Sequence, residues 1–101
     1  MRIAYKRVVC ADGFSMSVQA SEGSYCNPRT DDAARYDAVE VGYPSEEESL
    51  IIQFAENKEE PTATVYGWVP SEVVSLVLAK HGGMVDGEVP PGVPELRKVD
   101  E

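Results

Sequence analysis

The chain has 101 residues, of which nine are basic and eighteen are acidic, so its formal net charge is −9 at pH 7. This length fits one domain with a modest core, and a hydrophobic share of 43% is typical of a folded protein rather than a disordered one. The excess of acidic side chains argues against a protein that holds nucleic acid or an anionic membrane through a basic face of its own.

The first twenty residues predict a β-hairpin. Residues 3–10 are rich in β-branched and aromatic side chains, which favour a strand. The dipeptide Asp12-Gly13 follows and supplies the positive φ angles that a tight turn needs. Residues 14–20 then alternate apolar and polar side chains with a period of two, which indicates a strand with one buried face.

The middle of the chain predicts a long loop, a third strand and a helix. Residues 21–36 read as a loop, and connections of this length are often functional or mobile. A strand is predicted at about 37–43. The run Ser45-Glu46-Glu47-Glu48 matches a helix-opening capping box, and apolar residues then recur at helical spacing, which predicts a helix at 46–57. The apolar face of that helix consists of Leu50, Ile51, Phe54 and Ala55.

The last third of the chain predicts a fourth strand, a second helix and a tail. Residues 64–69 read as the strand, and Pro70 suits the first turn of a helix. The valines between 73 and 77 leave a strand as the alternative, but the ending Lys80-His81-Gly82-Gly83 is typical of a helix C-terminus. Residues 86–101 are expected to form a Pro-rich acidic, solvated tail that can lie along the surface, beside a single domain at 1–85.

The predicted order of elements, β-β-β-α-β-α, indicates an α+β domain in which two helices pack on one face of a small, mainly antiparallel sheet. No apolar run approaches the length of about 20 residues that spans a membrane, and the first residues lack the apolar core of a signal peptide. We therefore expect a cytoplasmic protein that does not associate with membranes.

Few residues of this chain suit catalysis or metal binding, because it has only two cysteines and one histidine. Zinc sites use four ligands at close spacings, whereas Cys10, Cys26 and His81 are widely separated. A nucleophilic cysteine or serine would need His81 as its base. We expect no enzyme, no cofactor and no metal, with both cysteines reduced in or near the core. A Cys10–Cys26 disulfide, and a metal or catalytic site that uses these three residues, stay open as minor alternatives.

The acidic charge is concentrated in residues 31–60, which hold ten acidic side chains and only two basic ones, Arg35 and Lys58. Such a cluster can simply keep a small domain soluble, or it can imitate a phosphate backbone and meet a basic partner. The predicted partner-binding residues are Glu46, Glu47, Glu48, Glu56, Glu59 and Glu60.

Aromatic side chains border the predicted strands and loops, and two interpretations are open for them. They pack in the core and sheet, or they anchor an interface beside the acidic cluster. These residues are Tyr25, Tyr36, Tyr43, Tyr66 and Trp68.

Two stretches of the chain carry a family resemblance. The first comprises residues 8–20 with Tyr25-Cys26-Asn27-Pro28-Arg29 after it, and the second runs from 65–70 into Lys80-His81-Gly82-Gly83. They resemble a group of small uncharacterised proteins encoded by bacteriophages and prophages, over most of residues 3–83. The resemblance brings no catalytic motif and no functional residue with it. It implies a context in which small acidic proteins often inhibit host machinery, among them anti-CRISPR proteins and DNA mimics.

We therefore expect a non-enzymatic phage-type protein that binds and inhibits a host nucleic-acid-binding protein or complex, with carboxylates of residues 31–60 occupying its basic site. The alternative is a structural or assembly module without an inhibitory role. It would form a homodimer through a free edge or an apolar patch of the 10–20 hairpin or the 65–69 strand. Both a monomer and a homodimer are compatible with the sequence.

Overall fold

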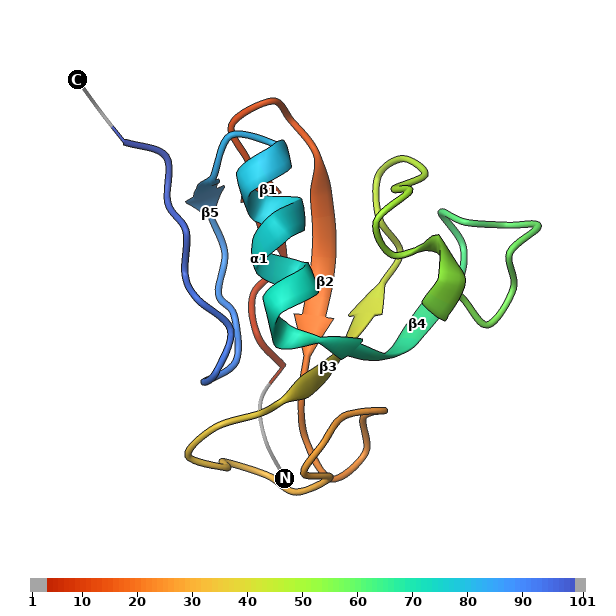
Figure 1. Cartoon of the computed structure of the whole chain (residues 1–101), viewed down its shortest axis with the longest axis vertical. Coiled ribbons are helices and arrows are strands. Elements are labelled where there is room, and N and C mark those ends of the chain that lie inside the picture. The colour runs from red at the N-terminus through yellow and green to blue at the C-terminus, as the bar shows by residue number, and fades with distance from the viewer. Residues whose placement is uncertain (1–3, 100–101) are drawn as a thin grey trace.

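A computed structural model describes residues 4–99 and shows a five-stranded sheet with one α-helix across it (Figure 1). The order of strands in the sheet is β4-β3-β2-β1-β5, and every neighbouring pair is antiparallel, so the α+β class is confirmed. The helix α1 (Ser71–Lys80) connects the two edge strands. The strands are β1 (Val8–Cys10), β2 (Ser15–Gln19), β3 (Ala38–Gly42), β4 (Val65–Pro70) and β5 (Met84–Asp86).

The predicted hairpin is confirmed, although its first strand pairs only over β1. Val8 lies opposite Met16, and Val9 lies opposite Ser15. A three-residue turn closes the hairpin, with Gly13 at a φ of +96°, where glycine has no steric penalty. Burial alternates along β2 as predicted, because its apolar side chains face the core.

The helix that follows Pro70 is also confirmed, and its apolar face packs on the sheet. Val74, Val77 and Leu78 are fully buried there. Gly82 and Gly83 follow with φ angles of +87° and +85°, and the Gly83 amide donates to the Leu78 carbonyl at 2.8 Å. This left-handed ending is the one that the Gly-Gly pair predicts.

The predicted helix at 46–57 is wrong, and with it the two-helix architecture. Residues 45–64 form an irregular lobe beside β4, which we call the acidic lobe (Figure 1). Its regular part is one turn of 3-10 helix, η1 (Ile52–Phe54). The observed order is therefore four strands, one α-helix and a fifth strand, with the 3-10 turn before the fourth strand.

Both edge strands of the sheet carry neighbouring segments of the same chain. Along β4, the Glu56 amide donates to the Val65 carbonyl at 3.0 Å, and Ala55 forms a bridge with Tyr66. Along β5, the Met84 amide donates to the Leu96 carbonyl at 2.7 Å. Because these edge groups are already paired, the geometry does not favour a homodimer built by adding a strand to either edge.

The C-terminal segment after β5 lies against the domain and contributes Val93 to the core, so it is less solvated than expected. The Tyr36 amide donates to the Pro91 carbonyl at 2.8 Å, and Val93 is buried against the core. The strand β5, which precedes this segment, was not predicted, because three residues are too few to show an alternating pattern. Within residues 4–99, no helix is both long enough and apolar enough to cross a bilayer.

The long loop at 21–36 is organised by hydrogen bonds around the buried ring of Tyr36. The Tyr36 hydroxyl donates to the Thr30 carbonyl at 2.6 Å and accepts from the Ala33 amide at 3.2 Å. The Glu22 amide donates to the Asp31 carboxylate at 2.9 Å. The loop therefore has a defined path instead of crossing open solvent.

Candidate functional site

A buried histidine lies between two carboxylates where three parts of the chain meet. His81, just after α1, approaches Asp12 of the hairpin turn with its Nδ1 at 2.6 Å and Glu48 of the acidic lobe with its Nε2 at 2.7 Å. The exposed fraction is 6% for His81 and 1% for Glu48. The ring of Phe14 stacks on the imidazole at 4.0 Å between centroids.

The geometry makes His81 a cation. An ionised carboxylate only accepts hydrogen bonds, so each ring nitrogen must donate to its partner. Burial disfavours the charged ring, but the hydrogen bonds to Asp12 and Glu48 outweigh it and raise the pKa of His81 above its usual 6.5. The two hydrogen bonds therefore favour the imidazolium form of His81.

The two carboxylates are correspondingly held as anions. Burial alone would raise the pKa of Glu48, yet hydrogen bonds from the Leu50 amide, His81 and Lys80 hold it below 4.5. The Lys80 ammonium lies 3.0 Å from the second oxygen of Glu48. The Phe14 amide and His81 hold the pKa of Asp12 below 3.8. Two anions thus balance two cations, and we call these four residues the His81 clamp.

The arrangement of the His81 clamp suits anchoring better than chemistry. Both ring nitrogens face carboxylates, so this imidazole has no nitrogen left to serve a nucleophile as a base. The carboxylates lie at opposite sides of the ring and do not converge, and no group of three or more metal-binding side chains occurs within residues 4–99. The clamp instead joins the acidic lobe, the hairpin turn and the end of α1.

The His81 clamp predicts a stability maximum at mildly acidic pH. Stability from the raised pKa of His81 is fully present below pH 6.5 and is lost as the pH rises through that raised pKa. Stability from the lowered pKa values of Asp12 and Glu48 is present above 3.8 and 4.5 and is lost as the pH falls through those lowered values. Urea unfolding across about pH 3 to 9 measures both arms of this profile.

The variant His81→Gln is the control for that pH profile, because an amide does not titrate. We expect its stability to be lower than that of the wild type and to change less above about pH 6.5. A wild-type profile that stays flat on the alkaline side, parallel to that of the variant, would contradict the assignment of a charged His81.

Neither cysteine is placed for nucleophilic chemistry. Cys10 and Cys26 are both free and both buried. Burial, and then the nearby charge of Asp12, raise the pKa of the Cys10 thiol to about 11, so it stays protonated and weakly nucleophilic. The disulfide alternative is not realised in this structure.

The acidic side chains predicted to bind a partner divide into one buried residue and five exposed ones. Glu48 is buried in the His81 clamp, so its carboxylate cannot contact a partner. The prediction that Glu48 belongs to an exposed binding surface is therefore wrong. Asp31 and Asp32 belong to the 21–36 loop, at the lower end of the molecule in Figure 1, away from the acidic lobe at the right. The exposed residues are Glu46, Glu47, Glu56, Glu59 and Glu60.

The aromatic side chains also divide. Tyr36 and Tyr66 are fully buried, as expected of core residues, whereas Trp68 is 52% exposed. Tyr25 stacks on Trp68 with ring centroids 5.0 Å apart, and the guanidinium of Arg29 lies 5.4 Å from the centroid of the Tyr25 ring. β4 therefore carries a half-exposed Trp68 that is stacked on the partly buried Tyr25.

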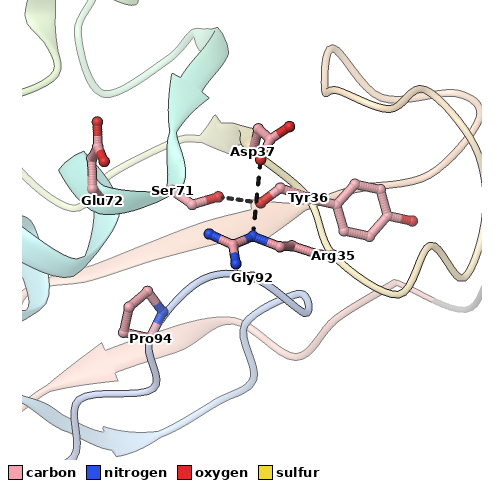
Figure 2. A pocket seen from close by; sticks show the side chains of 7 residues that line it. All are labelled: Arg35, Tyr36, Asp37, Ser71, Glu72, Gly92 and Pro94. Carbon is pink, nitrogen blue, oxygen red and sulfur yellow. Dashed lines mark hydrogen bonds and ion pairs between the residues drawn. The ribbon is translucent and has the colours of Figure 1, made fainter.

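A pocket of about 400 Å³ opens at the start of α1 (Figure 2). Two of its polar side chains are paired within the chain. The Ser71 hydroxyl donates to the Tyr36 carbonyl at 2.7 Å, and Arg35 lies 3.9 Å from Asp37. Figure 2 shows the Tyr36 ring directed away from the pocket. The pocket thus presents charges of both signs and no converging set of unpaired groups, and we assign it no function.

Searches against family models, curated proteins and solved structures return no significant match to this chain. The sequence did not identify Asp12 or Lys80 as members of a site. Glu48 was recognised only as one carboxylate of the glutamate run, with no local signal for burial that set it apart from Glu46 and Glu47.

Proposed function

We propose that this protein binds a basic, nucleic-acid-binding protein through the acidic lobe and thereby competes with nucleic acid for the same site. The observation that carries the proposal is the charge of the lobe, where five glutamates are exposed and Lys58 is the only basic residue. A dense patch of one sign favours encounter with a surface of opposite sign and selects against acidic partners.

The way the lobe is held supports this role. Its backbone does not fold as a helix, but it is tied to β4 by the Glu56–Val65 hydrogen bond and to the core by Glu48. A fixed backbone lowers the entropy lost when the carboxylates meet lysine and arginine side chains of a partner. The resemblance to phage proteins suggests the biological role that we propose. In that role the protein inhibits a host defence complex, as anti-CRISPR proteins do.

The test compares two variants with the same change in net charge, used as bait with a bacterial lysate. The wild-type protein is expected to capture a basic protein that salt elutes and that double-stranded DNA displaces in a purified pair. The lobe variant should bind that protein at least about ten-fold more weakly, while the control variant should bind it as the wild type does. The lobe variant is E46Q/E47Q/E59Q, and the control variant is E22Q/E72Q/E95Q.

Three results would contradict the proposal. The first is an equal loss of affinity in the two variants, which would mean that the acidic lobe acts only through the net charge of the protein. The second is capture that does not change between low and high salt. The third is a captured protein that DNA fails to displace. A salt-insensitive homodimer in light scattering would instead support the assembly alternative.

A further inference from the structure

Trp68 occupies an unusual position in β4. Opposite β3, the register shifts from Val39–Val69 to Val41–Tyr66, so Gly67 and Trp68 together face the single residue Glu40. This is a β-bulge. Within it, Trp68 has a φ of +50°, a left-handed conformation that a bulky side chain rarely adopts.

Burial does not account for this conformation. The bulge allows both Tyr66 and Val69 to face the core, but glycine or asparagine at position 68 would meet the same need with less strain. Instead, the bulge carries an indole that is 52% exposed. Strained residues of this kind concentrate at functional sites, and bulges often redirect a side chain toward such a site.

Tyr25 covers one face of the Trp68 ring, and the residue remains 52% exposed. Tyr25 stacks on the indole with an angle of 25° between the planes, and the Trp68 amide donates to the Tyr25 carbonyl at 3.0 Å. Gly67 lets Tyr25 lie close to the strand, since a Cβ there would come within 3.4 Å of it. Arg29 lies over the Tyr25 ring, and Trp68 is the more exposed member of the stack.

We propose that the exposed part of the Trp68 indole anchors a cationic side chain, above all an arginine, of the basic partner. The inference rests on the proposed function. Indole is the aromatic ring that attracts cations most strongly, and the net charge of −9 selects partners that present them. Arg29 on Tyr25 shows the same kind of contact within the chain.

The position of Trp68 allows it to act together with the acidic lobe. Trp68 lies three residues along β4 from Val65, and Val65 is hydrogen-bonded to Glu56 of the acidic lobe. Three strand residues span about 10 Å, which is the distance along β4 from Trp68 to this contact with the lobe. One basic surface of ordinary interface size can span that distance. Trp68 would then be a central anchor, and the carboxylates would attract and orient the partner.

The test uses a labelled hexa-arginine peptide and a hexalysine peptide of equal charge, with binding followed by anisotropy. Trp68→Ala is expected to weaken binding of hexa-arginine about two- to five-fold, with a smaller effect on hexalysine. Leu76→Ala, which removes another half-exposed apolar side chain on α1, should leave both affinities unchanged. Circular dichroism establishes that each variant is folded under the conditions of the assay.

The fluorescence of Trp68 gives a second readout, because it is the single tryptophan of the chain. Hexa-arginine should change this fluorescence in the wild type. The proposed anchor would be overturned if Trp68→Ala bound hexa-arginine with unchanged affinity. It would also be overturned if the fluorescence of Trp68 responded to single-stranded oligothymidine but not to hexa-arginine. If E46Q/E47Q/E59Q loses hexa-arginine binding while Trp68→Ala keeps it, only the anchor fails. If the lobe variant keeps full binding, the proposed function fails instead.

Discussion

Replacing Glu48 with alanine is expected to lower the free energy of unfolding by about 3 kcal/mol. The carboxylate is 1% exposed and accepts from His81, Lys80 and the Leu50 amide. Its removal leaves the buried His81 cation with Asp12 alone and leaves the Leu50 amide without its acceptor. Lys80 is half-exposed, so its ammonium can be solvated by water when Glu48 is absent. The expected loss of stability is therefore at the lower end of the range for a broken buried ion pair.

Chemical denaturation followed by circular dichroism measures this loss, and the neighbouring glutamate is the matched control. Glu47→Ala removes the same side chain from an exposed position, so we expect a change within about 0.5 kcal/mol. The double variant of Glu48 and His81 should be less damaging than the sum of the single ones, because the two side chains contact each other. If Glu48→Ala were as mild as Glu47→Ala, the His81 clamp would contribute nothing to the fold.

The His81 clamp also connects stability with the proposed binding surface. Glu48 fixes the start of the acidic lobe, and its backbone carbonyl accepts from the Ile51 amide at 3.2 Å. Loss of Glu48 should therefore loosen the lobe without removing an exposed charge. A single glutamate run thus has two roles, with one member buried as an anchor and its neighbours exposed to solvent.

The hairpin and α1 could be predicted because their signals are local. Asp12-Gly13 determines the turn, and Asp12 reinforces it by accepting from the Phe14 amide at 2.9 Å. Pro70 and the Gly82-Gly83 pair mark the two ends of α1 within the sequence itself. In these segments, local preference and tertiary packing favour the same structure.

The acidic lobe could not be predicted in the same way, because tertiary contacts override its local helical pattern. The capping-box reading has Glu48 turn back on its own helix start, but its carboxylate binds His81, 33 residues away. Ala55 pairs with Tyr66 of β4, which requires an extended backbone at that point. A capping box stabilises a helix by about 1 kcal/mol, whereas leaving a buried charge without its partner costs about 3 kcal/mol.

The candidate binding surface was predictable in composition but not in detail. The count of charges identified the glutamates of the acidic lobe. It did not show that Glu48, alone among Glu46, Glu47 and Glu48, would be buried. Trp68 was recognised as an aromatic at a strand, but its exposure depends on the register shift opposite Glu40. A bulge of one residue reverses which face a side chain occupies, and only the pairing of strands determines it.

Replacing Gly92 with alanine is expected to destabilise the protein by about 2–4 kcal/mol. Gly92 has a φ of +99°, and a Cβ at this position would meet the Tyr36 carbonyl oxygen and lie 2.7 Å from the Tyr36 amide nitrogen. Both contacts are with backbone, so the C-terminal segment must move away. Its displacement would break the hydrogen bond from Tyr36 to Pro91 and expose Val93 and the Tyr36 ring.

The control for Gly92 is Gly13, which separates the cost of the backbone angle from the cost of the displaced segment. Gly13 has a φ of +96°, but nothing lies within 4 Å of a Cβ placed there. Gly13→Ala should therefore cost only about 1 kcal/mol, the penalty of a left-handed alanine. The excess at Gly92, measured by urea unfolding, reports what the C-terminal segment contributes to the fold. Equal losses for the two variants would mean that the segment after β5 rests on the surface without stabilising the domain.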